Sequence, residues 1–118
     1  MNKLKSPAPE PTLDPVLVDK TLDQFQREAG EWADGNFTTS TVASIISHFR
    51  EEAGEFADEP SGEEAADCLL LLIHYAHKSG ISLYQEAERK LAINRKRIWK
   101  TTPEPGGHIK HVGKDGAQ

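Results

Sequence analysis

The stretch that decides the fold reads EAADCLLLLIHYA, from Glu64 to Ala76. A helix built from these residues is apolar nearly all round. Such a helix needs neighbours on several sides, so it belongs in the middle of a helical bundle. Ser61 and Glu64 have the spacing of a capping box at its start, and Gly80 is well placed to end it.

Three further helices are predicted around this central one. The first covers residues 16–33 and is broken by Gly35 and Asn36, the second follows the hydroxyl cluster at 38–41, and the fourth runs from Ser82 to about Trp99. Apolar residues recur in each at three- and four-residue steps. The stripes are Leu22, Phe25, Ala29 and Trp32 in the first helix, and Val42, Ile45, Ile46, Phe49, Ala53 and Phe56 in the second. The pattern predicts an all-α, four-helix bundle.

Prolines mark both ends of the chain. Four of the seven prolines lie in residues 1–15, and two more lie at 103 and 105. Because proline blocks helix continuation, we expect extended or flexible tails at 1–15 and at about 101–118, around one helical domain at 16–100. A core of this size is marginal alone, and the buried central helix lacks enough partners within one chain. A homo-oligomer, dimer or tetramer, is therefore expected.

Net charge and composition argue against several kinds of binding partner for this chain. The chain has 118 residues, 19 acidic and 14 basic residues, a net charge of -5 and no basic block, which disfavours binding to a nucleic-acid polymer. No apolar run approaches the roughly 18 residues of a membrane helix, and no secretory signal follows Met1. With Cys68 alone, an internal disulfide and a Cys-rich zinc site are excluded. These features favour a cytoplasmic protein without a membrane partner.

Two acidic pairs carry the functional information. They are Glu52-x-x-Glu55 in the second helix and Glu64-x-x-Asp67 in the third. Two antiparallel helices that each carry such a pair can point four carboxylates into one groove, where oxygen ligands suit Mg²⁺ or Mn²⁺. The plain alternative is a solvated acidic face, because other pairs have the same spacing: Glu28/Glu31, Glu31/Asp34 and Glu55/Asp58.

Position on the helical wheel separates these acids. Glu52 lies at the edge of its helix's apolar stripe, whereas Glu51 lies nearly opposite the stripe and should face water. Asp67 is surrounded by alanine and leucine, so its carboxylate needs a cation, hydrogen bonds or an altered pKa. The capping box by itself is also a sufficient reason for a glutamate at position 64, without a role in metal binding.

A second group of polar residues lies on the fourth helix. Lys90, Asn94 and Arg97 fall within a sector of about 60°. Arginine and lysine bind phosphate oxygens, so this sector is a candidate phosphate-binding face. The alternatives are solvent exposure for the two cations and a satisfied core amide for Asn94.

Three further residues have two interpretations each. His74 lies seven residues after Asp67, on nearly the same face, where it either reaches a bound ligand or is an ordinary core histidine. Trp32 and Phe37 are either core or interface residues, or they stack on a nucleobase.

Taken together, these motifs resemble the MazG-like all-α nucleoside triphosphate pyrophosphohydrolases, in particular the phage-type dATP/dGTP pyrophosphohydrolase group. The resemblance covers about residues 20–112 and includes the Gly107–Val112 segment. It implies hydrolysis of a (d)NTP between the α and β phosphates, giving a monophosphate and pyrophosphate. Purine deoxynucleotides are the expected substrates, dGTP first and dATP second. For a phage gene, the location would be the host cytoplasm.

The resemblance also implies roles for the candidate residues. Glu52, Glu55, Glu64 and Asp67 match the family's metal ligands, and Lys90, Asn94 and Arg97 match its phosphate-contacting helix. Glu52 or Glu55 would orient the attacking water or accept its proton. Two or three Mg²⁺ or Mn²⁺ ions per site are expected, since a triphosphate and four carboxylates repel each other without cations. His74 departs from the family pattern, because relatives more often carry an acidic residue there.

Two other readings compete with this one. A ferritin-like di-metal oxidoreductase is disfavoured, because no glutamate here has a histidine three residues later. A non-catalytic helical interaction or regulatory module, with solvated acids, is the remaining alternative.

Overall fold

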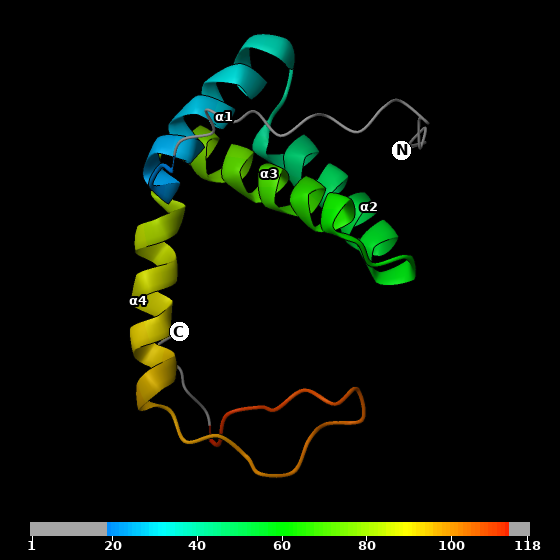
Figure 1. The fold of residues 1–118 in the computed structure, drawn as a ribbon, viewed down its shortest axis with the longest axis vertical. Coiled ribbons are helices and arrows are strands. Elements are labelled where there is room, and N and C mark those ends of the chain that lie inside the picture. Colours follow the sequence, from blue (N-terminus) through cyan, green and yellow to red (C-terminus); the bar gives the residue numbers. More distant parts are fainter. Residues whose placement is uncertain (1–18, 114–118) are drawn as a thin grey trace. The chain divides into compact units, whose positions relative to one another are not determined.

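The structure, a computed structural model, describes residues 19–113, and four α-helices account for most of them (Figure 1). These are α1 (Leu22–Asn36), α2 (Val42–Asp58), α3 (Gly62–Ser79) and α4 (Leu83–Lys96). Within this range no strand forms, only an isolated antiparallel bridge between Trp99 and His111. The all-α prediction is confirmed. The predicted tail at 1–15 lies outside the described residues, and the limits 16–100 for the domain stay a prediction.

The chain divides into two compact units, one ending at Tyr84 and the other beginning at Gln85. In the first unit, α3 packs against both α1 and α2, as its all-round apolar sequence predicts (Figure 1). Ile73 and Ala76 of α3 are completely buried, whereas Leu69, Leu70 and Leu72 stay exposed. None of the helices in residues 19–113 is long and apolar enough to cross a membrane.

Local capping sets the helix starts. Thr41 and Ser44 form a complete capping box at the start of α2, which confirms the hydroxyl cluster as the N-terminal signal. At the start of α3, the Ser61 hydroxyl accepts a hydrogen bond from the Glu64 amide at 3.1 Å. Gly80 ends that helix with a left-handed backbone, φ 73°. Thr41, Ser61 and Gly80 are thus confirmed as boundary residues, while the full capping box of Ser61 and Glu64 stays a prediction.

Both ends of α1 differ from the prediction. The helix begins after Thr21, which forms a capping box with Gln24, so residues 19–21 are not helical. Residues 16–18, where the predicted start falls, are outside the described range. The helix also continues through Gly35 to Asn36. A single glycine costs an α-helix only about 1 kcal/mol, so it did not end this one.

The buried face of α1 also differs from the predicted apolar stripe. Gln26, Gly30 and Ala33 are buried, whereas Trp32 is 61% exposed. The Gln26 amide donates to the Ile81 carbonyl at 2.7 Å, and its oxygen accepts from the Leu83 amide at 3.0 Å. A Cβ atom at Gly30 would lie 2.3 Å from Cγ of His77. Small residues therefore face α3 because the helices approach closely.

An ionic cluster joins the end of α1 to α3. Asp34 lies 2.9 Å from Nζ of Lys78, 3.1 Å from Nε2 of His74 and 3.2 Å from Nε2 of His77. Hydrogen bonds from Lys78 and His74 lower the pKa of Asp34 below its ordinary value of 3.8. The ionised carboxylate thus ties the two helices together.

In the second unit, the chain folds back after α4. The helix ends at Lys96 and not at Trp99, whose indole nitrogen donates to the Asn94 carbonyl at 3.0 Å. The Lys100 amide donates to the Lys110 carbonyl at 2.8 Å, and the Val112 amide donates to the Ile98 carbonyl at 2.6 Å. These bonds fold the non-helical segment 101–112 back on itself, and the extended C-terminal tail stays a prediction.

We expect Gly30→Ala to lower the free energy of unfolding by about 1–3 kcal/mol, because the added methyl group overlaps the His77 ring. Gly35→Ala in the same helix is the matched control. Nothing lies within 4 Å of a Cβ atom at Gly35, so this change should raise stability by up to about 1 kcal/mol. Urea unfolding measures both, and equal stability of the two variants would contradict the close approach.

Asp34→Asn should destabilise the protein at neutral pH and make little difference in acid. The pKa of Asp34 is lowered by folding, so its stabilisation is present above pH 3.8 and is lost as the pH falls through the folded-state value. We therefore expect the difference between the urea midpoints of wild type and Asp34→Asn to shrink as the pH is lowered from neutral to about pH 3. Asp58→Asn, at an exposed position in α2, is the control. A wild-type advantage that persists unchanged in acid would contradict this account.

Candidate metal centre

Three carboxylates from two helices meet in one place. Glu52 of α2 and Glu64 and Asp67 of α3 offer ligand oxygens that all lie within 4.8 Å of one another. Glu52 is 1% exposed and Glu64 is 2% exposed, while Asp67 is half-buried. The packing of α2 against α3 therefore brings together three of the four predicted acids.

The chemistry of this donor set fits hard divalent cations. Carboxylate oxygens are the ligands that Mg²⁺ and Mn²⁺ prefer, and a cation among three buried or half-buried carboxylates offsets their mutual repulsion. The Glu64 amide takes part in the helix cap, but its carboxylate belongs to the acidic group. A cap alone therefore does not account for this residue.

Glu55 lies apart from this group. It is half-buried on α2, one turn beyond Glu52, and among the described residues its carboxylate is not within the 4.8 Å group. Its predicted role as a ligand stays a prediction.

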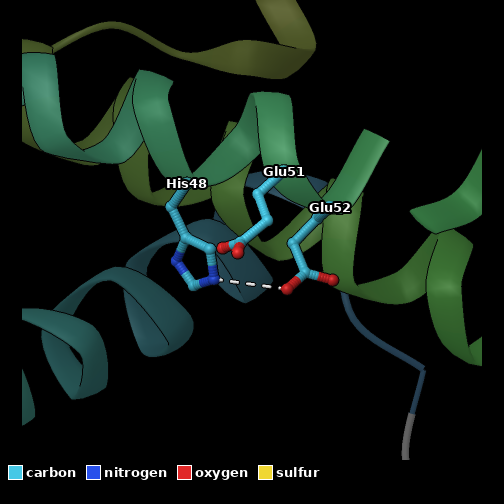
Figure 2. Close-up of side chains that lie close together, drawn as sticks. All are labelled: His48, Glu51 and Glu52. Carbon is cyan, nitrogen blue, oxygen red and sulfur yellow. Dashed lines mark ion pairs between the residues drawn. The ribbon is translucent and has the colours of Figure 1, made fainter. Parts of the chain in front are cut away.

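A histidine that the sequence analysis did not single out lies beside the acids. His48, Glu51 and Glu52 form a second group whose ligand atoms lie within 4.8 Å of one another (Figure 2). Nε2 of His48 is 3.3 Å from Oε2 of Glu52. Glu51 is exposed, as the helical wheel predicts, but its carboxylate belongs to this group. The four-residue spacing of His48 and Glu52 was the available signal.

A cavity of about 240 Å³ opens beside the acids in the first unit. Its wall combines apolar and aromatic side chains with four polar ones. The lining residues are Ala29, Trp32, Ala33, Phe37, His48, Glu52, Asp67, Leu70, Leu71 and His74. The acidic group thus borders a hollow large enough for part of a small molecule.

Trp32 and Phe37 form an aromatic wall of this cavity. Their rings meet edge to face, with centroids 5.5 Å apart. They are 61% and 50% exposed, so the interpretation of these residues as core is wrong for the single chain. Their place beside the cavity is compatible with base stacking.

His74 is buried against the same cavity. It is 4% exposed, and its Nε2 lies 3.1 Å from Oδ1 of Asp34. His74 is therefore buried as a core histidine would be, and the Asp34 carboxylate is the partner of its Nε2 atom. Asp34 was missed as this partner, since only the packing of α1 on α3 brings the two residues together.

Lys90, Asn94 and Arg97 belong to the second unit. Lys90 is exposed, whereas Asn94 and Arg97 are half-buried. Arg97 lies one residue beyond α4, and its Nη1 donates to Oδ1 of Asn94 at 3.0 Å. Two of the three residues therefore contact each other, and their role with phosphate stays a prediction.

Two phage proteins are similar to this chain, one in sequence and one in fold. The dATP/dGTP diphosphohydrolase of Salmonella phage PMBT28 is 29% identical over 114 residues, which are 95% of this chain and 39% of that protein. A cyanophage S-2L MazG-like pyrophosphohydrolase, solved with dGDP and three catalytic Mn²⁺ ions per active site, is 26% identical with a TM-score of 0.69. The match covers 81% of this chain and 97% of that chain.

The resemblance seen in the sequence is confirmed by a family model as well. The model described as dATP/dGTP pyrophosphohydrolase matches residues 25–117, which contain nearly all of α1 and the whole of α2, α3 and α4. The fold is MazG-like, in agreement with the solved cyanophage protein. The chain belongs to the dATP/dGTP pyrophosphohydrolase family.

Proposed function

We propose that this chain hydrolyses a purine deoxynucleoside triphosphate between its α and β phosphates, releasing a monophosphate and pyrophosphate. The observation that carries the proposal is the convergence of Glu52, Glu64 and Asp67 beside a cavity with an aromatic wall. Family membership and the dGDP bound by the cyanophage protein support a purine substrate, with dGTP first and dATP second.

Glu52, Glu64 and Asp67 would hold two or three Mg²⁺ or Mn²⁺ ions, with Glu55 as a further ligand. Bound divalent cations supply positive charge between the triphosphate and the carboxylates and polarise the phosphoryl oxygens. The three Mn²⁺ ions of the cyanophage protein support this cofactor.

The chain's own side chains would perform the remaining tasks. The aromatic wall of Trp32 and Phe37 stacks on the base. Glu52 or Glu55, as an ionised carboxylate, orients the attacking water and accepts its proton.

Lys90, Asn94 and Arg97 would contact phosphate oxygens, and the two cations would offset charge on the departing pyrophosphate. The bond between Asn94 and Arg97 supports this role, because it holds the guanidinium in one orientation. We also propose a homo-dimer or homo-tetramer. Exposed leucines on α3 support this assembly, since apolar surface is stabilised by burial.

Asp67→Asn and Glu64→Gln should each lower the turnover of dGTP by at least about 100-fold, because each removes a carboxylate ligand while keeping side-chain size. Pyrophosphate release across the four dNTPs, with Mg²⁺ or Mn²⁺ and with product identification, measures the effect. Glu63→Gln is the matched control, since Glu63 is the exposed neighbour of the buried Glu64. Normal activity in Asp67→Asn would refute the site. Absence of pyrophosphate release by folded wild-type protein would favour the non-catalytic module.

Trp32→Ala should raise KM for dGTP roughly tenfold, with a smaller effect on kcat, because base–aromatic stacking contributes about 1–3 kcal/mol. Trp32→Phe keeps an aromatic face and should retain most of the affinity. Steady-state kinetics of both variants with dGTP and dATP provide the measurement. An unchanged KM in Trp32→Ala would show that the base binds elsewhere.

A further inference from the structure

His48 gives the acidic centre a nitrogen donor. His48, Glu51 and Glu52 lie at four- and three-residue spacings on α2, so one face of the helix presents an imidazole and two carboxylates (Figure 2). Their ligand atoms lie within 4.8 Å of one another, and Glu52 also belongs to the group with Glu64 and Asp67. The two groups therefore share one carboxylate.

The orientation of the His48 ring points to coordination. Nε2 is buried and lies 3.3 Å from Oε2 of Glu52, an ion pair when the ring is protonated, and within residues 19–113 this nitrogen makes no hydrogen bond (Figure 2). In an octahedral site with metal–ligand distances of about 2.0–2.1 Å, neighbouring donor atoms are about 2.9 Å apart. The nitrogen and the oxygen thus have close to the spacing of two ligands of one ion.

We propose that His48, Glu51 and Glu52 hold a divalent transition-metal ion at a position that Glu52 bridges to the all-oxygen group. This inference rests on the proposed function, because it extends the same centre. Imidazole favours transition metals, whereas all-oxygen sets suit Mg²⁺. The position therefore selects Mn²⁺ or Co²⁺ over Mg²⁺, and it accounts for why α2 carries a histidine one turn before Glu52.

Pulsed EPR of the nucleotide-free full chain loaded with Mn²⁺ tests the assignment. Wild type should show a ¹⁴N coupling from a directly bound imidazole, and His48→Gln should lose it while Mn²⁺ stays bound at the all-oxygen group. Titration calorimetry with Mn²⁺ should show at least about tenfold weaker binding of one ion in this variant, with Mg²⁺ binding unchanged.

Controls separate ligand loss from loss of fold. His108→Gln makes the same chemical change at an exposed histidine of the second unit and should keep the coupling. Glu51→Gln alters an exposed side chain, so the protein should fold, and it should weaken the same ion without removing the nitrogen.

The outcomes distinguish this inference from the proposed function. Mn²⁺ bound without ¹⁴N coupling in wild type, or a coupling that survives in His48→Gln, would overturn the His48 assignment and leave the proposed function standing. A folded wild-type protein that binds no Mn²⁺ and releases no pyrophosphate would overturn both the His48 assignment and the proposed function.

Discussion

The whole site depends on the packing of α2 against α3, which concentrates negative charge in one place. Glu52 and Glu64 are almost fully buried, and Asp67 lies beside them. Like charges at this spacing destabilise an ion-free protein, so cation binding and folding stability are coupled. In the proposed metal centre, the same repulsion would favour binding of a divalent ion. The folding stability of the ion-free protein and the affinity for a divalent ion therefore both depend on this clustering of carboxylates.

Close packing of α1 on α3 positions the other wall of the cavity. Gly30 and Ala33 allow the two helices to approach, and Asp34 then reaches His74, His77 and Lys78. Because these contacts use the small and polar face of α1, Trp32 projects away from the buried face and meets Phe37 beside the acids. An exposed tryptophan is thus a consequence of tight helix packing, and it gives the cavity an apolar aromatic wall.

The donor atoms available to a metal ion vary across the centre. Glu52, Glu64 and Asp67 present only oxygens, whereas His48 adds an imidazole on the α2 side. Since Glu52 belongs to both groups, binding of one ion changes the charge that a second ion experiences. In the proposed centre, the identity of the metal would therefore depend on two coupled positions.

Local signals in the sequence determined much of this protein. Thr41, Ser61 and Gly80 set helix boundaries through contacts within a few residues, and the apolar run of α3 required a central position. The acid spacing and the family resemblance indicated Glu52, Glu55, Glu64 and Asp67, and the packing of α2 on α3 brings all but Glu55 together. The tertiary structure alone decided which face of α1 is buried and that Asp34 pairs with His74. These features depend on the rotation and separation of whole helices. Side-chain volumes at the helix contacts set both quantities, and the periodicity of the sequence does not reveal them.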